Sequence, residues 1–558
     1  MKQEQALAFL KSGRNVFLTG SAGTGKTYVL KQYIHYLKER KIPVAVTAST
    51  GIAATHMNGM TIHSWAGIGI KDKLSSANLK TLKTKKYLEK KLDKVKVLII
   101  DEISMLHQNQ LTLVDQVLKF FKMNQLPFGG VQLVLCGDFF QLPPVGNPHE
   151  SSKDKFAFMS PVWVQYELTV CYLTEQYRQN NDELRNILNE IRSGRISEYR
   201  YLKLKATEHQ TLDMAIEPTR LFTHNVNVDD INQQELAKLR GKSSFYTAEV
   251  KGNEKLLETL TKSVLANEQI ELKAGAKVMF VRNNPEKGIV NGSLGEVVDF
   301  DEENIPLVKL LDERIVSAEP EDWKIQDESG KTLARFNQVP LRLAWAITIH
   351  KSQGMTLDAA EIDLSNTFEK GQGYVALSRL KKLESLRLLG LNETALKIEP
   401  LAFKADKRFK ELSDQVASNT SDETLNKEAF SFLESCGGLT DENAIKKQKD
   451  KLLISQSEKE NTYDITYSYL KQHIPLEQIA EERGMTTGTI AGHLIKIKKD
   501  YPEANLSHYK PAKSIVNKVE AVYQKTPREK VVSLKKIYEA LGGKISYTDI
   551  KLSLAFIV

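Results

Sequence analysis

At 558 residues the chain is longer than one hydrophobic core usually serves, so we expect three or four domains. Its 41% hydrophobic and 27% charged residues are typical of a soluble globular protein. No apolar stretch is long enough to cross a bilayer, which argues against a membrane-embedded protein. The start, "MKQEQALAFLKSGRN", lacks a secretory signal pattern, which predicts a cytoplasmic location. Only Cys136, Cys171 and Cys436 occur, too few for a disulfide framework or a four-cysteine metal site. The net charge of +8 permits a polyanionic partner without demonstrating one.

Short apolar runs alternate with helical stretches in the first part of the chain. "NVFLTG", "PVAVTAST", "KVLIIDE" and "VQLVLCGD" end in Gly, Thr or acidic residues, which predicts an open parallel sheet with ligands at the carboxyl ends of its strands. A second series follows in "PTRLFTHN", "LRLAWAITIH" and "SLRLLGL". We therefore predict an α/β fold with two lobes, at residues 1–172 and 173–405.

Two segments interrupt this alternation. From Asn291 to about Gln338, Gly-bounded short strands without a helical period predict a small antiparallel β-barrel inserted in the second lobe, at about 291–338. Residues Lys80 to Lys96, in an insertion at about 64–96 of the first lobe, carry eight lysines against Glu89 and Asp93. A solvated helix and a surface that faces nucleic acid both fit this lysine-rich segment.

The last third of the chain changes in composition twice. Residues 406–460 are polar, which predicts a linker with one helix at Glu428 to Cys436. Residues 461–558 show helix–turn–helix spacing, with Ile479 before the turn and Ile490 after it, and predict an all-α domain. This region has fifteen Lys plus Arg against ten Asp plus Glu, so both DNA contact, with Lys496 as a candidate, and a packing or partner-binding role stay open.

"FLTGSAGTGKT" has the pattern of a phosphate-binding P-loop between an apolar strand and a helix. Its glycines let successive backbone N–H groups converge on phosphate oxygens, while Lys26 reaches the β- and γ-phosphates and Thr27 ligates Mg²⁺. The sequence therefore predicts ATP and Mg²⁺ as cofactors. The predicted nucleotide-binding residues of the loop are Gly20, Ser21, Ala22, Gly23, Thr24, Gly25, Lys26 and Thr27.

An acidic pair follows another apolar run in "VKVLIIDEISML". Asp101 is placed to hold the metal together with Thr27, and Glu102 to orient and deprotonate a water, which makes the site hydrolytic. A plain helix N-cap is the alternative for this pair. Arg178 in "LTEQYRQ" and Arg379 in "GYVALSR" are candidates for the positive charge that phosphoryl transfer requires in its transition state. If both belong to the second lobe, ATP lies in a cleft between the lobes.

Taken in order, these motifs resemble those of the Pif-type and RecD-like DNA helicases of superfamily one, which move 5′ to 3′ on single-stranded DNA. The resemblance covers residues 1 to about 400 and implies two RecA-like P-loop lobes. The segments that carry it are "GSAGTGKT", "TASTGIAAT", "TIHSW", "LIIDEISM", "PFGGVQLVLCGDFFQLPPV", "LTEQYRQ", "LFTHNVNVDDIN", "VNGSLGEVV", "WAITIHKSQGMTLD" and "GQGYVALSR".

The resemblance implies roles for individual positions. Gln141 matches the glutamine that contacts the γ-phosphate, and Arg178 and Arg379 match the two arginines that reach it. Gln5 matches the glutamine that reads adenine, with Gln3 as the second choice, and Gly354 joins the nucleotide-binding set. The implied DNA-contacting residues are Thr50, Thr61, His63, Ser64 and Phe139 in the first lobe and His350, Lys351 and Ser352 in the second. The inserted barrel resembles the family's strand-gripping domain, and the lysine-rich segment lies where such enzymes carry a small duplex-separating insertion.

The function predicted from all of this is an ATP-dependent helicase. We expect a monomer that acts on single-stranded DNA and on tailed or forked duplex, with no membrane partner. Two alternatives are a nucleotide-switched regulator that binds duplex through the helix–turn–helix, and an accessory subunit of a recombination complex. The intact set of Lys26, Asp101, Glu102, Gln141, Arg178 and Arg379 argues against both, because a non-catalytic chain would tolerate the loss of some of them.

Overall fold

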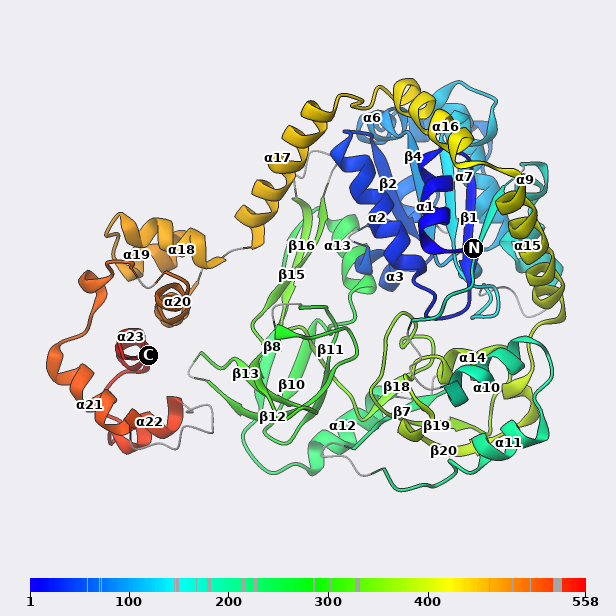
Figure 1. Cartoon of the computed structure of the whole chain (residues 1–558). Helices are drawn as coiled ribbons and strands as arrows, with labels where there is room; N and C mark the ends of the chain where they lie inside the picture. Colours follow the sequence, from blue (N-terminus) through cyan, green and yellow to red (C-terminus); the bar gives the residue numbers. More distant parts are fainter. Residues whose placement is uncertain are drawn as a thin grey trace. The chain divides into compact units, whose positions relative to one another are not determined.

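The computed structural model describes residues 1–57, 59–69, 71, 73–144, 146, 150–166, 168–177, 182–212, 217–223, 228–284, 287–301, 303–326, 332–460, 462–483, 485–501, 503–524 and 534–557. These form two compact units (Figure 1): residues 1–299 with 307–445, and residues 446–558 with the short segment 300–306. In the described part of the chain, no helix combines the length and apolar character needed to cross a membrane.

The first lobe is built on a six-stranded parallel sheet in the order β3-β2-β4-β5-β1-β6. Every residue of β1, β4 and β5 is buried, because helices cover both faces of such a sheet. The four apolar runs that predicted strands are β1, β2, β4 and β5, so that prediction is confirmed. The strands are β1 (Val16–Gly20), β2 (Val44–Ala48), β3 (Met60–Thr61), β4 (Val97–Asp101), β5 (Gln132–Cys136) and β6 (Thr169–Leu173).

The helices of the first lobe pack around this sheet, and Figure 1 shows α1 and α2 against its strands. They are α1 (Gln3–Lys11), α2 (Lys26–Glu39), α3 (Gly51–His56), α4 (Ile62–Ala66), α5 (Ser76–Lys83), α6 (Lys86–Lys94), α7 (Gln108–Lys122), α8 (Ser152–Lys155) and α9 (Pro161–Gln165). The lysine-rich segment is α5 and α6. Leu82, Leu88 and Leu92 are its buried side, whereas Lys80 and Lys90 are among its exposed lysines. It is therefore an amphipathic pair of helices with a basic outer surface.

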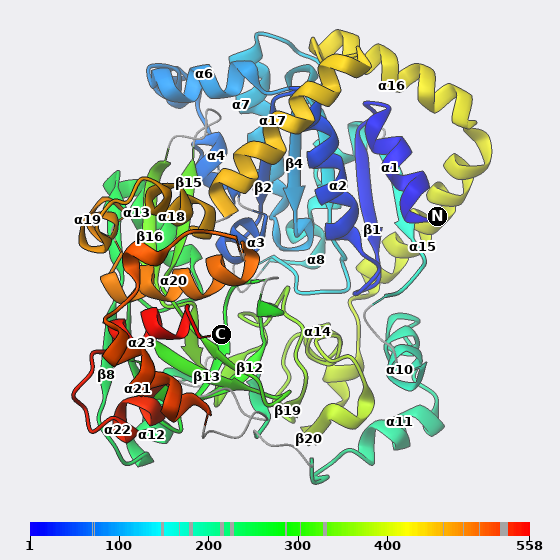
Figure 2. The same ribbon diagram turned by 60° about the vertical axis from the view of Figure 1, so that its left-hand side comes forward.

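The second lobe has a four-stranded parallel sheet in the order β18-β7-β19-β20, which confirms a second α/β lobe. Its strands are β7 (Thr219–Phe222), β18 (Ala346–Thr348), β19 (Ala360–Leu364) and β20 (Leu386–Leu391), and its helices are α10 (Asp182–Arg192), α11 (Glu198–Lys205), α12 (Val228–Lys238) and α14 (Gln372–Leu377). Helix α10 lies beside α14, as Figure 2 shows.

The antiparallel insertion is larger than the sequence predicted, because it begins at Ser244 and not at Asn291. Its strands form a five-stranded sheet, β14-β13-β12-β11-β17, a three-stranded sheet, β15-β16-β9, and the pair β10-β8. Since the described pairings form separate sheets, closure into a barrel stays a prediction. The elements are β8 (Ser244–Thr247), β9 (Glu249–Gly252), α13 (Glu254–Ser263), β10 (Gln269–Leu272), β11 (Lys277–Phe280), β12 (Leu294–Phe300), β13 (Pro306–Leu310), β14 (Ile315–Ser317), β15 (Glu321–Gln326), β16 (Thr332–Gln338) and β17 (Leu341–Leu343).

Residues 406–460, predicted as a linker with one helix at Glu428 to Cys436, are mostly helical. This segment continues α15 (Pro400–Asn419) and then forms α16 (Asp422–Cys436) and α17 (Glu442–Glu460). The Phe409 ring packs edge-on against Phe17 of the first lobe at 4.9 Å, and Leu425 and Leu433 are buried in the core that includes α1. A few apolar side chains at helical spacing, and not the polar average, therefore decide the structure of this segment.

The C-terminal unit is helical. Ile479, Ala480, Ile490 and Leu494 share one core, and the Thr486 hydroxyl caps α20 by accepting a hydrogen bond from the Thr489 N–H. The predicted helix–turn–helix is confirmed as α19 and α20, although Gly484 of its turn lies outside the described residues. The helices are α18 (Thr462–Lys471), α19 (Leu476–Arg483), α20 (Thr487–Asp500), α21 (Lys513–Gln524), α22 (Leu534–Ala540) and α23 (Tyr547–Leu554).

Candidate active site

The P-loop runs from the end of β1 to the start of α2, as its pattern predicts. Gly23 and Gly25 have φ of 84° and 82°, a conformation that side chains disfavour, which is why glycine is needed there. Lys26 Nζ donates to the carbonyl oxygens of Gly20 and Ser21, both at 2.9 Å. Burial lowers the pKa of Lys26, while the nearby Asp138 opposes that shift. The ammonium group therefore lies over the loop that would hold phosphate.

Two residues outside the motif flank the P-loop. The Gln3 side-chain amide donates to the carbonyl oxygen of Thr24 at 3.1 Å. The backbone N–H of Tyr177 donates to the carbonyl oxygen of Gly23 at 2.8 Å. Tyr177 is 58% exposed to solvent. An amide and an open aromatic ring thus lie together at one edge of the loop.

Gln5, the first choice for the adenine-reading glutamine, lies elsewhere. Its side-chain oxygen accepts a hydrogen bond from the backbone N–H of Lys2 at 3.2 Å, and the residue is exposed. Because α1 begins at Gln3, Gln5 takes the third helical position and caps the helix. The structure thus places Gln3, the second choice, beside the P-loop.

The acidic pair lies at the carboxyl end of β4. Asp101 Oδ1 accepts from the backbone N–H of Glu102 at 2.9 Å, and Glu102 has φ of 52°, an uncommon conformation for a residue with a side chain. Burial raises the pKa of Asp101. Burial and then the adjacent Asp101 carboxylate raise the pKa of Glu102 to about 7, and Lys26 and Arg379 oppose that rise. Such a carboxyl group is suited to accept a proton from water.

Gln141 meets a glutamine of the second lobe that the motif analysis did not select. Gln353 Nε2 donates to Glu102 Oε2 at 3.1 Å and lies 3.5 Å from Gln141 Oε1. Gln353 belongs to "TIHKSQGMTLD", a segment that predicted DNA contacts. Its polar side chain in that segment was the only indication in the sequence that it could have a role in the site. The two glutamines and Glu102 join the lobes at one point.

The loop that carries Gln141 is held chiefly by Asp138. The Phe140 N–H donates to Asp138 Oδ1 at 3.2 Å, and the Gln141 N–H donates to the Asp138 carbonyl oxygen at 3.0 Å. This is a turn in which an aspartate side chain replaces a backbone acceptor. Asp138 was not selected as a site residue from the sequence.

The remaining residues predicted for the nucleotide site are Arg379, Gly354 and Arg178. Arg379 follows α14, is 1% exposed, and donates through Nε to the Val375 carbonyl oxygen at 3.0 Å and through Nη2 to Ser378 Oγ at 2.8 Å. Its positive charge opposes the rise in the pKa of Glu102. Gly354 is exposed with φ of 79° in the turn after β18. Arg178 lies outside the described residues.

The predicted DNA contacts of the first lobe lie at the ends of adjacent strands. Thr50 caps α3, and Thr61 caps α4. The Thr61 hydroxyl also donates a hydrogen bond to the Ser64 hydroxyl. Thr61 pairs in register with Ala48 of β2. Phe139 departs from the prediction. It is 4% exposed and packs against Phe17, Phe158 and Trp163, because its side of the loop faces the lobe's aromatic core.

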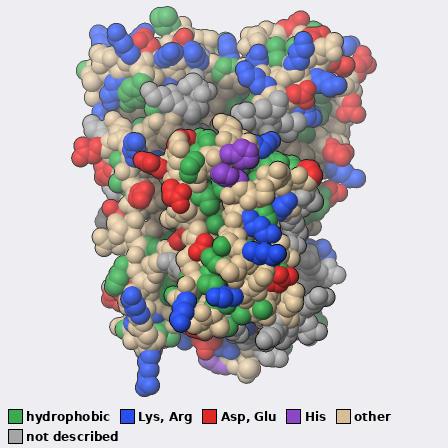
Figure 3. Space-filling view, turned by 90° about the vertical axis from the view of Figure 1, so that its left-hand side faces the viewer, with side chains coloured by type: hydrophobic (Ala, Val, Ile, Leu, Met, Phe, Trp, Pro, Cys, Tyr) green, Lys and Arg blue, Asp and Glu red, His purple; other side chains and the backbone are tan. Residues whose placement is uncertain are grey.

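In the second lobe the predicted contacts follow β18. His350 and Lys351 are partly buried, and burial lowers the pKa of His350 as it does that of His63. Ser352 is fully buried, and its hydroxyl donates to the Ile349 carbonyl oxygen at 2.8 Å, so its side chain is turned inward. The Lys496 side chain lies outside the described residues. On the face shown in Figure 3, described Lys and Arg side chains are interspersed with Asp and Glu.

A divalent cation has a limited set of donors in this site. Among the described residues no group of three or more His, Cys, Asp and Glu side chains could hold a metal. The Asp101 carboxylate and the exposed Thr27 hydroxyl offer the oxygen donors that Mg²⁺ prefers, and Mg²⁺ usually takes its other ligands from substrate phosphates and water. The donor set therefore fits a metal that arrives with a nucleotide.

A P-loop, a strand-end acidic pair and an arginine from a second parallel-sheet lobe define a two-lobe P-loop nucleotide hydrolase. Family models described as PIF1-like helicase, DNA helicase Pif1 2B domain and helix-turn-helix domain match residues 3–201, 255–300 and 462–554. An ATP-dependent DNA helicase Pif1 from Psychrobacter is 45% identical over the whole of both chains. The chain belongs to the PIF1-like helicase family and is an ATP-dependent DNA helicase of the Pif1 type.

Solved structures agree with this assignment. The Bacteroides Pif1 in complex with ADP-AlF4 is 31% identical, with a TM-score of 0.62, over 73% of this chain and 96% of that one. The Bacteroides Pif1 helicase in complex with ADP-AlF3 and single-stranded DNA is also 31% identical, with a TM-score of 0.50, over 72% of this chain and 94% of that one.

Proposed function

We propose that ATP hydrolysis between the two lobes drives this chain 5′ to 3′ along single-stranded DNA, and that tailed or forked duplex is unwound as the chain advances. The observation that carries the proposal is the hydrogen bond of Gln353 in the second lobe to Glu102 in the first. It places a group of the motif that resembles DNA-binding segments directly on the candidate catalytic base. A change at the phosphate is therefore communicated to a DNA-facing turn through one side chain.

For hydrolysis, each group has a distinct task in this proposal. Backbone N–H groups of the P-loop and Lys26 hold the phosphates, and Glu102 orients a water and takes its proton. Asp101 and Thr27 would hold Mg²⁺, which neutralises phosphate charge when bound. Arg379, whose charge lowers the pKa of Glu102, supplies positive charge to the transferring phosphoryl group. Arg178 is proposed for the same task from its motif alone.

For DNA binding, the proposal uses the turns that follow adjacent strands in each lobe. In the first lobe Thr50, Thr61 and His63 lie at the ends of β2 and β3, and in the second lobe His350 and Lys351 follow β18. The exposed lysines of α5 and α6 supply a basic surface for the duplex, and the antiparallel insertion is proposed to grip the strand. Phe139 and the Ser352 side chain are not included, because both are buried.

Direction is tested on duplexes that carry a single-stranded tail at only one end. With ATP and Mg²⁺, we expect strand separation of the duplex with a 5′ tail and little or none of a blunt duplex or one with a 3′ tail. The measurement is the rate of release of a labelled strand under single-turnover conditions. Faster release from the 3′-tailed duplex would contradict the assigned direction.

The placement of Gln3 beside the P-loop predicts base recognition by that residue. Gln3→Ala is expected to raise the KM for ATP about tenfold, the loss of one to two hydrogen bonds, and to reduce the preference for ATP over GTP. Gln5→Ala is the matched control, since it removes the same amide two positions along the same helix. Initial rates over a range of ATP and GTP concentrations measure both. A larger effect of Gln5→Ala on the KM would contradict base recognition by Gln3 and would favour Gln5 as the adenine-reading residue.

A further inference from the structure

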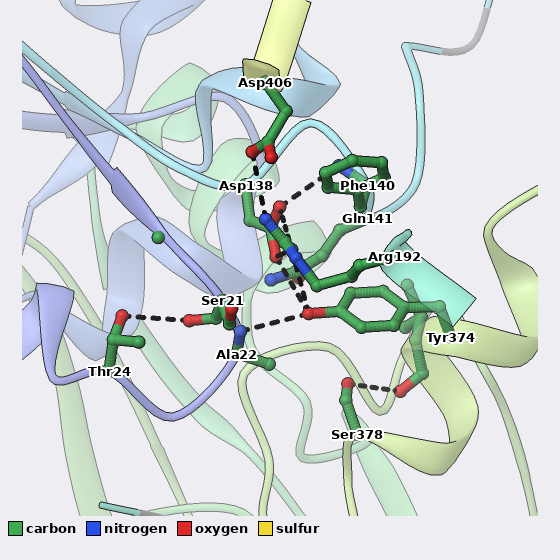
Figure 4. Close-up of polar contacts among 12 residues, drawn as sticks. Ser21, Ala22, Thr24, Asp138, Phe140, Gln141, Arg192, Tyr374, Ser378 and Asp406 are labelled. Atoms are coloured by element: carbon green, nitrogen blue, oxygen red, sulfur yellow. Dashed lines mark hydrogen bonds and ion pairs between the residues drawn. The ribbon is translucent and has the colours of Figure 1, made fainter. Parts of the chain in front are cut away.

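A buried arginine at the end of α10 joins parts of both lobes. Arg192 is 6% exposed, and its Nη1 donates to both oxygens of the Asp138 carboxylate at 2.8 and 2.7 Å and to the Tyr374 hydroxyl at 3.0 Å. Its Nη2 donates to the Tyr172 hydroxyl at 2.9 Å and to Asp406 Oδ1 at 3.1 Å. Figure 4 shows Arg192 with Asp138, Tyr374 and Asp406 beside the P-loop.

The aromatic ring that precedes Gln141 also contacts this arginine. The Arg192 guanidinium carbon lies 4.2 Å from the centroid of Phe140, which is a cation–π distance. Arg192 therefore holds the Gln141 loop from two sides, through the Asp138 carboxylate and through the Phe140 ring. A lysine would supply the charge but not the planar fork that these contacts use.

Tyr374 extends the network to the P-loop and to the arginine of the second lobe. Its hydroxyl donates to Asp138 Oδ2 at 3.2 Å and accepts a hydrogen bond from the backbone N–H of Ala22 at 3.2 Å. Tyr374 is in α14, five residues before Arg379. One set of contacts therefore links the P-loop, the Gln141 loop and the helix that leads to Arg379.

Two cations, Arg192 and Lys410, balance the two carboxylates of this buried network, which favours a lasting set of contacts. Arg192 lies between two carboxylates, Asp138 and Asp406, and the Lys410 ammonium lies 3.2 Å from Asp406. Removing one member of a buried ion set is costly, because the others lose their partners. The nearby Arg192 and Lys26 cations lower the pKa of Asp138 in spite of its burial.

We propose that Arg192 is a positioning residue of the hydrolysis cycle: through Asp138, Phe140 and Tyr374 it keeps Gln141 of the first lobe and Arg379 of the second in register on the same phosphate. This role rests on the proposed function, in which both of those residues act at the γ-phosphate. Arg192 itself touches no nucleotide in this role. Its effect is on the rate of hydrolysis when both lobes engage, and not on capture of ATP.

The direct test is Arg192→Lys, and Tyr374→Phe covers the case in which that variant does not fold. Tyr374→Phe deletes one hydroxyl and keeps the ring. We expect it to lower the kcat of ATP hydrolysis stimulated by single-stranded DNA about tenfold, with the KM for ATP changed less than about threefold. Tyr33→Phe is the matched control, because the Tyr33 hydroxyl is also buried and donates to Gln132 Oε1 at 2.6 Å, at the opposite end of β5. It is expected to lower the melting temperature to a similar extent and to leave kcat unchanged.

A double variant separates positioning from simple stabilisation. If Tyr374 acts through the Gln141 loop, Tyr374→Phe adds little to the loss of kcat caused by Gln141→Ala. The kcat of the double variant is then at most about threefold lower than that of Gln141→Ala alone. Losses that multiply, or a Tyr374→Phe kcat equal to that of Tyr33→Phe, would overturn the positioning role while the proposed function stands. A wild-type chain whose ATP hydrolysis is not stimulated by DNA would overturn the proposed function and this role with it.

Discussion

Arg379→Ala is expected to lower DNA-stimulated ATP hydrolysis by about 10³–10⁵-fold, the range that an arginine acting on a transferring phosphoryl group contributes. Arg379 comes from the second lobe, yet its charge lowers the pKa of Glu102, the candidate catalytic base of the first lobe. Its short-range bonds to Val375 and Ser378 fix the side chain before any nucleotide arrives. Binding of an ATP analogue should be retained, because the P-loop and Lys26 are untouched. Rapid-quench hydrolysis and analogue titration measure the two quantities separately.

Two further variants limit the interpretation of Arg379→Ala. Arg387→Ala removes an arginine of the same lobe that pairs with Glu361, away from the P-loop, and is expected to change hydrolysis little. Arg379→Lys keeps a charge without the planar fork and should recover only part of the rate. Equal losses in Arg379→Ala and Arg387→Ala would indicate that the second lobe had merely been destabilised.

The parts of the site that sequence predicted well are those set by local chain geometry. A glycine-rich loop between strand and helix and an acidic pair after a buried strand are each encoded by a few consecutive residues, so Lys26, Asp101 and Glu102 could be assigned from the sequence. Their convergence follows from the order of parallel strands, since carboxyl ends meet at one edge of the sheet.

The parts that sequence missed depend on contacts between distant segments. Arg192 is the last residue of an ordinary amphipathic helix, and only its contacts with Asp138, 54 positions away, show what it does. Gln353 lies in a motif that predicted DNA contacts, yet it donates to Glu102, the candidate catalytic base. The choice between Gln3 and Gln5 depended on where α1 begins, because one residue of shift rotates a side chain by about 100° around the helix.

The environments of adjacent aromatic residues could not be assigned from the sequence, for a related reason. "GDFFQLPPV" places Phe139 and Phe140 next to each other, and either could stack on a base. In the structure Phe139 enters the core with Phe17 and Phe158, while Phe140 covers the Arg192 guanidinium. Neighbouring side chains on a turn point in different directions, and the pattern alone does not show which environment each one meets. Pro143 and Pro144 restrict the backbone after Gln141, and the Asp138 turn holds the residues before it.

Lys26→Ala is expected to reduce ATP hydrolysis by at least about 10²–10³-fold and to abolish unwinding, because it removes the cation nearest to the phosphates in the P-loop. Lys26 Nζ already lies over the loop on two carbonyl oxygens, so it can exchange these acceptors for phosphate oxygens without moving far. Binding of single-stranded DNA in the absence of nucleotide should persist, since the predicted contacts lie on other turns. Hydrolysis assays and fluorescence anisotropy with a labelled oligonucleotide measure these two outcomes.

Lys31→Ala is the matched control for this prediction. It removes an exposed lysine from the same helix, α2, and changes the net charge by the same amount. If electrostatic attraction of ATP to the surface were the main effect of Lys26, both variants would raise the KM for ATP and leave kcat intact at saturation. A loss of kcat confined to Lys26→Ala, at ATP concentrations that saturate the wild type, would instead show that the ammonium stabilises the transition state, where the charge on the phosphoryl oxygens is redistributed.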